Sequence, residues 1–396
     1  MQFINSQDLF NISQGSPYYS IIFDIRPNSE FDANHVIQSL NLDVSKLNTD
    51  ISNIKGSNKA SIEFLKQLPV WDKIEKRTKL KIFFISDKDQ SVFLTDIFII
   101  FTNCISPHRL FALDVDFDSF KQNYPVVCIS TTGEKEKENI LTEIPNEIIP
   151  GLFLGGYVDA EIMLNIIKQL QITHILVCAY EFTPDSDGKA LMEYKIPEGI
   201  IIHYLDMEDD DDQLIDFEGS FEFIDNALFG QDHSKQSSSS QEIIFLHHQK
   251  TLVHCIQGKS RSASVVIGYL MIKFHLTFAK AFEIVFHQRS IISPKFGFVK
   301  QLYMKEYELI GKYGEVDQEL ILLRRNEVDP LLATEITLGK RMNPLISLSD
   351  ISKLPQQYEM YLSNIRFMYS KVYNRAKYEW EAEKQGKDEN IKSEEQ

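Results

Sequence analysis

The fold is decided by residues 251–270, which read TLVHCIQGKSRSASVVIGYL. A short apolar run leads to Cys255, and after a few polar residues the apolar side chains recur at helical spacing from Val265 onward. Glycine and polar residues separate the two runs, as in a turn. We therefore predict a buried strand, a tight loop that contains Gly258 and Arg261, and a helix.

A strand, a loop and a helix in this order are suited to bind an anion. The loop amides and the first N–H groups of the helix lack helical partners, so they point into one concavity. The helix dipole adds about half a positive charge at the same place. We expect a cysteine at the mouth of this concavity to be held as a thiolate, the nucleophilic form of the residue.

The chain is acidic and long enough for more than one core. It has 396 residues and a net charge of −16, with 43% apolar and 25% charged residues. At about 150 residues per domain, this length predicts two or three domains of ordinary globular composition. The negative charge argues against nucleic acid or an anionic membrane as a general partner, so an anion site must be local.

The cysteines and the N-terminus indicate a reducing compartment. The four cysteines are far apart, with no CxxC pair and no Cys/His spacing typical of zinc sites, so we expect no disulfide, no metal and no cofactor. The first residues lack a basic segment followed by a long apolar run, and the most apolar stretch, 92–105, is short and contains Asp96. We expect a protein of the cytoplasm or the nucleus, without a membrane segment.

The loop sequence resembles that of a known enzyme family. Residues 254–262, HCIQGKSRS, fit the pattern HCxxGxxR[ST] of cysteine-dependent phosphatases, and GLFLG at 151–155 and ITHIL at 172–176 match other family segments. Over residues 143–312 the chain closely resembles dual-specificity phosphatases. This resemblance implies an α/β fold with a central sheet flanked by helices, and hydrolysis of phosphoproteins through a cysteinyl-phosphate.

Each part of the loop has an expected role. Cys255 is the expected nucleophile, and the planar guanidinium of Arg261 can hold two phosphate oxygens. By the resemblance, His254 supports the loop and Ser262 helps the thiolate leave in the second step. A helix N-cap is the other interpretation of Ser262, and the two roles are compatible. The remaining expected phosphate-binding residues are Ile256, Gln257, Gly258, Lys259 and Ser260.

The leaving oxygen of the substrate needs a proton donor from another loop. The segment YLDMED at 204–209 resembles the family's strand and acid position, which makes Asp209 the expected general acid. Three further aspartates follow, and the loop before Phe217 is one or two residues shorter than usual. Asp210 and Asp211 therefore stay open as alternatives.

The first 130 residues show a second α/β pattern. The segments IIFDIRPNSEFDANHV at 21–36 and LDVDFDSF at 113–120 resemble the rhodanese-like fold. The catalytic cysteine of a sulfurtransferase would follow the strand at 81–85, but SDKD stands there, at 86–89. We therefore expect a scaffolding or docking domain that does not transfer sulfur.

Composition marks the domain boundaries. The predicted order is a rhodanese-like domain (1–130), a charged linker (131–142), the phosphatase domain (143–312) and a helical extension with a disordered charged tail (313–396). A polar, serine-rich stretch at 231–241 predicts a flexible surface insertion within the phosphatase domain.

A rhodanese-like domain before a phosphatase domain is similar to the architecture of mitogen-activated-protein-kinase phosphatases, in which the first domain docks the kinase through basic residues. The resemblance implies a phosphoprotein substrate, with a protein kinase docked by the N-terminal domain as one candidate. The nearest basic cluster in this chain consists of Lys73, Lys76, Arg77, Lys79 and Lys81.

Two departures from the family pattern leave alternatives open. Gln257 replaces the usual alanine, and Lys295 replaces an asparagine that braces the loop. A lysine cannot make the paired donor and acceptor contacts of an asparagine, so we expect weaker activity. A phosphoprotein-binding pseudophosphatase is one alternative function. A phosphoinositide phosphatase is another, because Lys259 adds a positive charge to the loop.

Overall fold

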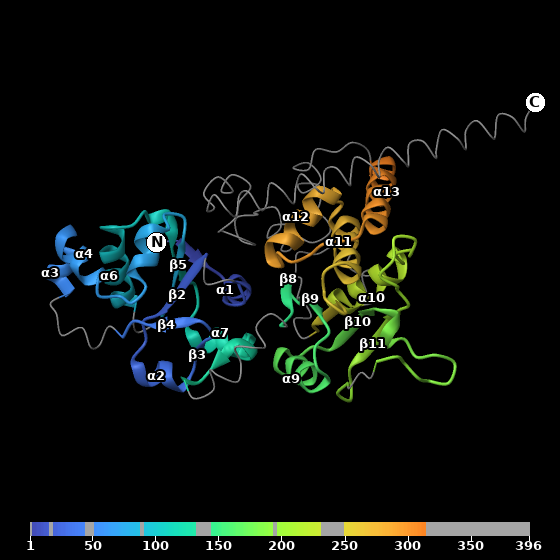
Figure 1. Cartoon of the computed structure of the whole chain (residues 1–396), viewed down its shortest axis with the longest axis horizontal. Coiled ribbons are helices and arrows are strands. Elements are labelled where there is room, and N and C mark those ends of the chain that lie inside the picture. Colours follow the sequence, from blue (N-terminus) through green and yellow to red (C-terminus); the bar gives the residue numbers. More distant parts are fainter. Residues whose placement is uncertain are drawn as a thin grey trace, which may run out of the picture. The chain divides into compact units, whose positions relative to one another are not determined.

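The structure is a computed structural model. It describes residues 2–15, 19–43, 51–87, 91–131, 144–192, 196–230 and 249–313. These residues form two compact units, one up to residue 131 and one from residue 144 (Figure 1). Almost all of the predicted linker (131–142) and extension (313–396), and the whole insertion (231–241), lie outside the described residues. Within the described ranges, no helix has both the length and the apolar character needed to span a membrane.

The N-terminal unit is built on a parallel sheet of five strands in the order β1-β6-β5-β2-β4, accompanied by a two-stranded ribbon of β3 and β7. The strands are β1 (Gln2–Ile4), β2 (Ser20–Asp24), β3 (His35–Val36), β4 (Ser39–Asn41), β5 (Lys81–Ile85), β6 (Leu110–Leu113) and β7 (Cys128–Ile129). The helices are α1 (Ser6–Ser13), α2 (Asn28–Ala33), α3 (Ile51–Lys55), α4 (Asn58–Leu65), α5 (Trp71–Lys76), α6 (Ser91–Thr102) and α7 (Phe117–Asn123), with short 3₁₀ turns at Pro107–Arg109 and Pro125–Val127. The predicted alternation of strands and helices is confirmed.

Alternate residues of β2 and the residue after it enter one apolar core. Ile21 and Phe23 of β2, and Ile25 just beyond its end, belong to a buried cluster that also includes side chains of β5, β6, α4 and α6, because successive side chains of a strand point to opposite faces. On α6, Phe101 sets its ring edge-on against Phe23, with 5.7 Å between the centroids. Helices α3, α4 and α6 lie together on this side of the sheet (Figure 1).

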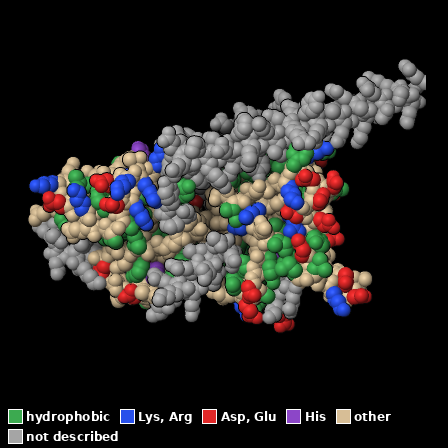
Figure 2. All heavy atoms as spheres, in the orientation of Figure 1, with side chains coloured by type: hydrophobic (Ala, Val, Ile, Leu, Met, Phe, Trp, Pro, Cys, Tyr) green, Lys and Arg blue, Asp and Glu red, His purple; other side chains and the backbone are tan. Residues whose placement is uncertain are grey.

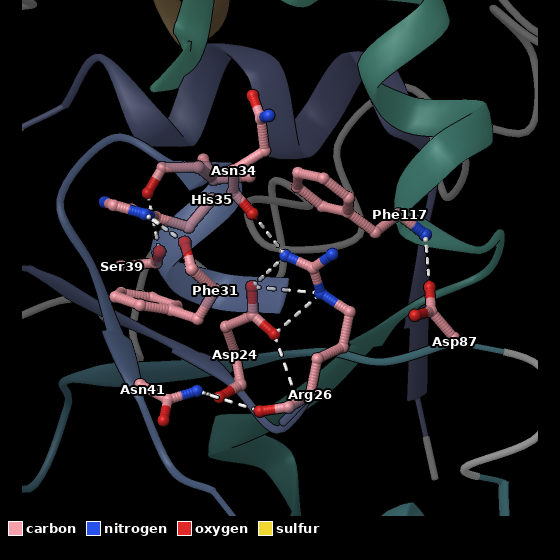
Figure 3. A network of polar contacts seen from close by, with 10 residues as sticks. Asp24, Arg26, Phe31, Asn34, His35, Ser39, Asn41, Asp87 and Phe117 are labelled. Carbon is pink, nitrogen blue, oxygen red and sulfur yellow. Dashed lines mark hydrogen bonds and ion pairs between the residues drawn. The ribbon is translucent and has the colours of Figure 1, made fainter. Parts of the chain in front are cut away.

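A buried ion pair stands at the end of β2 (Figure 3). Arg26 Nη2 lies 2.7 Å from Asp24 Oδ2, and the two side chains are 5% and 0% exposed. The same nitrogen donates to the carbonyl of Asn34 at 2.7 Å, and the guanidinium carbon lies 3.5 Å from the centroid of the Phe117 ring. The arginine is therefore occupied by a carboxylate, a carbonyl and an aromatic face.

The second unit is built on a five-stranded sheet in the order β11-β10-β12-β9-β8. Four of the strands are parallel, and the edge strand β8 is antiparallel. The strands are β8 (Asn146–Ile149), β9 (Leu152–Gly156), β10 (His174–Cys178), β11 (Ile201–Leu205) and β12 (Thr251–Cys255). The helices are α9 (Ala160–Leu170), α10 (Phe217–Phe229), α11 (Arg261–Phe274), α12 (Phe278–Gln288) and α13 (Phe296–Tyr313), with a 3₁₀ turn at Tyr180–Phe182.

Helix α11 is the buried centre of the second unit. It packs against α10, α12 and α13, which lie on one side of the sheet, whereas α9 lies on the other (Figure 1). Gly268 makes the packing of α10 possible, since an added Cβ there would lie 2.7 Å from the ring of Phe217. The strand, loop and helix predicted over 251–270 are confirmed, and they place the loop at the carboxyl end of the central strand.

Candidate active site

Cys255 lies at the carboxyl end of β12, which pairs in parallel with β10 on one side and β9 on the other. The residue is 3% exposed. Its Sγ accepts two hydrogen bonds, each 3.2 Å long, from the backbone N–H of Gly258 and the hydroxyl of Ser262. Donors from the loop and from the first turn of α11 thus converge on the sulfur, an arrangement suited to a thiolate acceptor.

The loop closes tightly over the end of β9. Gly258 has a φ of +65°, and a Cβ added there would collide with the backbone of Gly155. A Cβ added to Gly156 would lie 2.8 Å from the carbonyl carbon of Gln257. Glycine is therefore required on both sides of this contact, at 258 by the backbone conformation and at 156 by the close approach of the loop.

A buried arginine braces the same loop. Arg289, which follows α12 and is 5% exposed, donates from Nε to the carbonyl of Gly258 at 3.0 Å. It donates from Nη1 to Asn146 Oδ1 at 2.9 Å. Burial lowers the pKa of Arg289 to about 10, although the charge of Cys255 acts in the opposite direction. The guanidinium remains positive at neutral pH and lies behind the loop that holds the sulfur.

Arg261 is held by the carboxylate of Glu181, which lies in the 3₁₀ turn after the neighbouring strand β10. Its Nη1 and Nη2 donate to the two carboxylate oxygens of Glu181 at 2.7 and 3.2 Å, and Nη1 also donates to the carbonyl of Met207 at 3.0 Å. Burial alone would lower the pKa of Arg261, but Glu181, Cys255 and Asp209 together raise it. Within the described part of the chain, its buried Nε has no partner.

The acidic run lies in the loop between β11 and α10. Asp209 is close enough to Arg261 to act on its pKa, as Cys255 does. The carboxylate of Asp210 accepts a hydrogen bond from the N–H of Asp212 at 3.1 Å, and that of Asp211 accepts one from α13. Asp209 therefore acts electrostatically on the same arginine as Cys255, while the carboxylates of its two neighbours accept hydrogen bonds from backbone groups.

Comparison with known proteins shows which family the chain belongs to. Residues 152–308 match the family model described as "Dual specificity phosphatase, catalytic domain". "Dual specificity protein phosphatase 13B" of Mus musculus is 33% identical over 177 residues, which cover 44% of the chain and 79% of the relative. "Dual specificity protein phosphatase 1" of Arabidopsis thaliana is 33% identical over 159 residues, 40% of the chain and 67% of the relative. The chain is a dual-specificity protein phosphatase.

A further relative of this phosphatase is similar over a longer stretch. The "Probable rhodanese domain-containing dual specificity protein phosphatase" of Dictyostelium discoideum is 26% identical over 361 residues, which cover 77% of the chain and 68% of the relative. A match of this length includes part of the N-terminal unit as well as the phosphatase unit.

His254 and Ser262 both contact Cys255, one from β12 and the other from α11. His254 is fully buried, and its Nδ1 lies 3.2 Å from the carbonyl oxygen of Cys255. Burial lowers the pKa of His254 to about 4, so the ring is neutral at pH 7. The N-cap of α11 is Ser260, whereas Ser262 lies inside the helix and donates to Sγ. The N-cap interpretation of Ser262 is therefore wrong.

The remaining loop residues differ in exposure. The side chains of Gln257 and Lys259 are exposed, whereas Ile256 is half-buried. The loop backbone is held at Lys259, whose carbonyl accepts a hydrogen bond from the N–H of Ser293 at 2.7 Å. Among the described residues, no group of three or more His, Cys, Asp or Glu could hold a metal ion.

Two residues of the site were missed by the sequence analysis. Glu181 binds Arg261 across 80 residues of sequence, and Arg289 binds Gly258 across 31. Neither belongs to a local pattern. Both contacts join segments that are far apart in the sequence, so no local signal could have predicted them.

Proposed function

We propose that the phosphatase hydrolyses phosphotyrosine and phosphoserine or phosphothreonine in proteins through a cysteinyl-phosphate on Cys255. The observation that carries this proposal is the pair of hydrogen bonds from Gly258 and Ser262 to Sγ, at the point where the dipole of α11 begins. The buried Nε of Arg261, which has no partner in the described ranges, supplies a donor for a phosphate oxygen beside the sulfur.

The proposed reaction has two steps. In the first, Sγ of Cys255 attacks phosphorus, the bond from phosphorus to the substrate oxygen breaks, and Asp209 gives that oxygen its proton. In the second, the Asp209 carboxylate takes a proton from a water molecule that attacks phosphorus. The S–P bond then breaks, inorganic phosphate is released, and the hydroxyl of Ser262 stabilises the departing thiolate through the hydrogen bond to Sγ.

The test compares two cysteines of neighbouring strands. Cys255→Ser should lower kcat/KM on phosphotyrosine and phosphoserine peptides by at least about 10³-fold. Cys178→Ser, the same exchange at a fully buried residue on β10, should keep activity. Equal activity of the wild type and Cys255→Ser would contradict the proposal.

Two other outcomes would replace the function. Tight binding of the phosphopeptides by the wild type without phosphate release would indicate a pseudophosphatase. Faster release of phosphate from inositol lipids than from the peptides would indicate a phosphoinositide phosphatase. A Cys255→Ser or Asp209→Ala variant should also retain bound phosphoproteins from a lysate, which would identify the protein substrates.

We infer that the N-terminal unit is a rhodanese-like docking domain and that the whole chain is organised like a mitogen-activated-protein-kinase phosphatase. The parallel five-stranded sheet and the name of the Dictyostelium relative support the first part. Ser86 and Asp87 follow β5, so the position expected for a persulfide cysteine carries no thiol. We place the protein in the cytoplasm or the nucleus, as its cysteine pattern suggests.

Kinase docking can be tested on the basic cluster. Lys73 and Lys76 on α5 are exposed, and Lys76 pairs with Asp72 at 3.1 Å. Figure 2 shows Lys and Arg side chains on the N-terminal unit with acidic side chains between them. Substituting glutamate for both lysines reverses their charge and should slow dephosphorylation of a phosphorylated kinase but not of a short phosphopeptide. The same exchange at the exposed Lys59 and Lys66 is the control, and equal loss in both pairs would argue against docking by the cluster.

A further inference from the structure

Lys295, which replaces the family's asparagine, is anchored to the phosphate-binding loop by its backbone. It stands immediately before α13, and its N–H donates to the hydroxyl oxygen of Ser260 at 3.2 Å. Two residues earlier, the N–H of Ser293 donates to the carbonyl of Lys259 at 2.7 Å. The position of Lys295 is therefore set by the loop that carries the nucleophile.

The side chain of Lys295 reaches from this anchor to the acidic loop. Its Nζ donates to the backbone carbonyl of Asp209, and it lies 3.6 Å from the carboxylate Oδ2 of the same residue. The lysine side chain is 43% exposed and that of Asp209 is 42% exposed. An ion pair so open to water contributes little to stability, so the contact matters mainly for where Asp209 is held.

The rest of the acidic loop is fastened to α13 at three more points. The N–H of Gly297 donates to Asp211 Oδ1 at 3.0 Å, and a Cβ at Gly297 would collide with the carbonyl of Asp211. Gln301 accepts from the N–H of Ile215 at 2.8 Å and donates to the carbonyl of Gln213 at 2.7 Å. Lys295 provides the contact on the side of the loop that carries Asp209.

We propose that Lys295 is a positioning residue for the general acid, which rests on the proposed role of Asp209. Proton transfer requires the acid within hydrogen-bond reach of the leaving oxygen, and a displacement of about 1 Å can cost a large factor in rate. Lys295 ties the backbone of Asp209 to the loop that binds the phosphate, which fixes the distance between acid and phosphorus. Because Oδ2 lies beyond hydrogen-bond distance of Nζ, the carboxyl oxygens remain available for proton transfer.

The test uses two substrates that differ in their need for an acid. A phosphotyrosine peptide releases a phenol with a pKa of about 10, so its leaving oxygen needs a proton. An aryl phosphate made from a much more acidic phenol releases the phenolate without one. Lys295→Met should lower kcat/KM on the peptide by about tenfold and leave the activated ester nearly unchanged. Lys295→Arg, which keeps a donor on a long side chain, should restore most of the loss.

Two further variants make the result decisive. Lys280→Met breaks another lysine ion pair, the half-buried one with Glu283 at 3.6 Å on α12, and should change the rate on neither substrate. In an Asp209→Asn background, Lys295→Met should cause no additional loss. Equal losses on both substrates, or an additional loss in that background, would overturn the role of Lys295. A selective loss in Asp209→Asn without one in Lys295→Met would overturn it while leaving Asp209 as the acid, and no selective loss in Asp209→Asn would overturn both.

Discussion

In the described part of the chain, each unit holds one buried arginine against a carboxylate, but only one of the two has a buried nitrogen without a partner. Arg26 and Arg261 are both 4% exposed. Arg26 gives Nε and Nη2 to Asp24 and lies over the ring of Phe117. Arg261 gives its two terminal nitrogens to Glu181 and keeps Nε without a partner in the described residues, beside the charge of Cys255.

The difference lies in which nitrogens are used and in what stands nearby. A guanidinium offers five donors. At Arg26, the carboxylate takes Nε and an aromatic face covers the group, so it stabilises the turn after β2. At Arg261, the carboxylate of Glu181 accepts from the two terminal nitrogens, Nη1 and Nη2, which leaves Nε for an anion. A buried arginine is therefore a binding group only where its partners leave an edge open.

The largest effect is expected at Arg261. Arg261→Lys should lower kcat/KM on phosphopeptides by about 10²–10³-fold, because an ammonium cannot bind Glu181 and a phosphate oxygen at fixed angles as a planar fork does. The thermal midpoint of the phosphatase unit should change little, so that the loss of rate does not come from unfolding. Steady-state kinetics and thermal unfolding of the same samples check both statements, and a rate near that of the wild type would contradict the comparison.

Arg26 should show the opposite pattern. Arg26→Met leaves Asp24 buried without its partner, so the free energy of unfolding of the N-terminal unit should fall by about 3–5 kcal/mol. Activity on a short phosphopeptide should be unchanged at temperatures where both units remain folded. Denaturant unfolding followed alongside activity tests this, and a loss of activity before any loss of structure would show that Arg26 also serves the reaction.

The carboxylate that holds Arg261 should matter less than the arginine itself. Glu181→Gln keeps the shape but replaces charge-assisted hydrogen bonds with weaker neutral ones, so kcat/KM should fall by about tenfold. Glu161→Gln, the same exchange on an exposed position of α9, is the matched control. If both variants kept the wild-type rate, the ion pair with Glu181 would have no part in orienting Arg261.

The smallest effect concerns a buried carboxylate that has no arginine. Burial raises the pKa of Asp8 well above 3.8, and the charge of Asp114 adds to the shift. The folded state therefore binds the proton more tightly than the unfolded chain. The resulting stability is present below about pH 3.8 and is lost as the pH rises through the folded-state pKa.

Asp8→Asn removes this titration. The thermal midpoint of the variant minus that of the wild type should increase as the pH is raised from 4 toward neutrality. Melting curves at several pH values provide the measurement, with Asp72→Asn at an exposed site as the control. A difference that is constant over this range would mean that Asp8 has the same proton affinity in both states.

Local signals were enough to predict the catalytic loop. The apolar run, Gly258 and the helical spacing from Val265 are close in sequence, so they predict the strand, the turn and the helix that the structure has. The same stretch carries Cys255 and Arg261 at a fixed spacing. The hydrogen bond from Ser262 to the sulfur is shown only by the structure, because a serine near a helix start fits both a cap and a donor to the sulfur until the first helical residue is known.

Contacts between distant segments were beyond such signals. From the sequence, Lys295 indicates only the loss of an asparagine, whereas the structure shows that it contacts Asp209, 86 residues away. Only the structure likewise shows which carboxylate of the acidic run acts on the pKa of Arg261 and which accepts a hydrogen bond from the backbone of α13.

The sequence by itself determined the order of strand, loop and helix around Cys255 and the chemical groups that this order presents. Backbone preference and helical periodicity depend on neighbouring residues, so they can be obtained from the chain alone. The tertiary structure decided which carboxylate pairs with Arg26 and which with Arg261, and therefore that Nε of Arg261 has no partner in the described residues while that of Arg26 binds Asp24. The reason is physical: the partner of a charged group is set by the segments that packing brings beside it, at any separation in sequence.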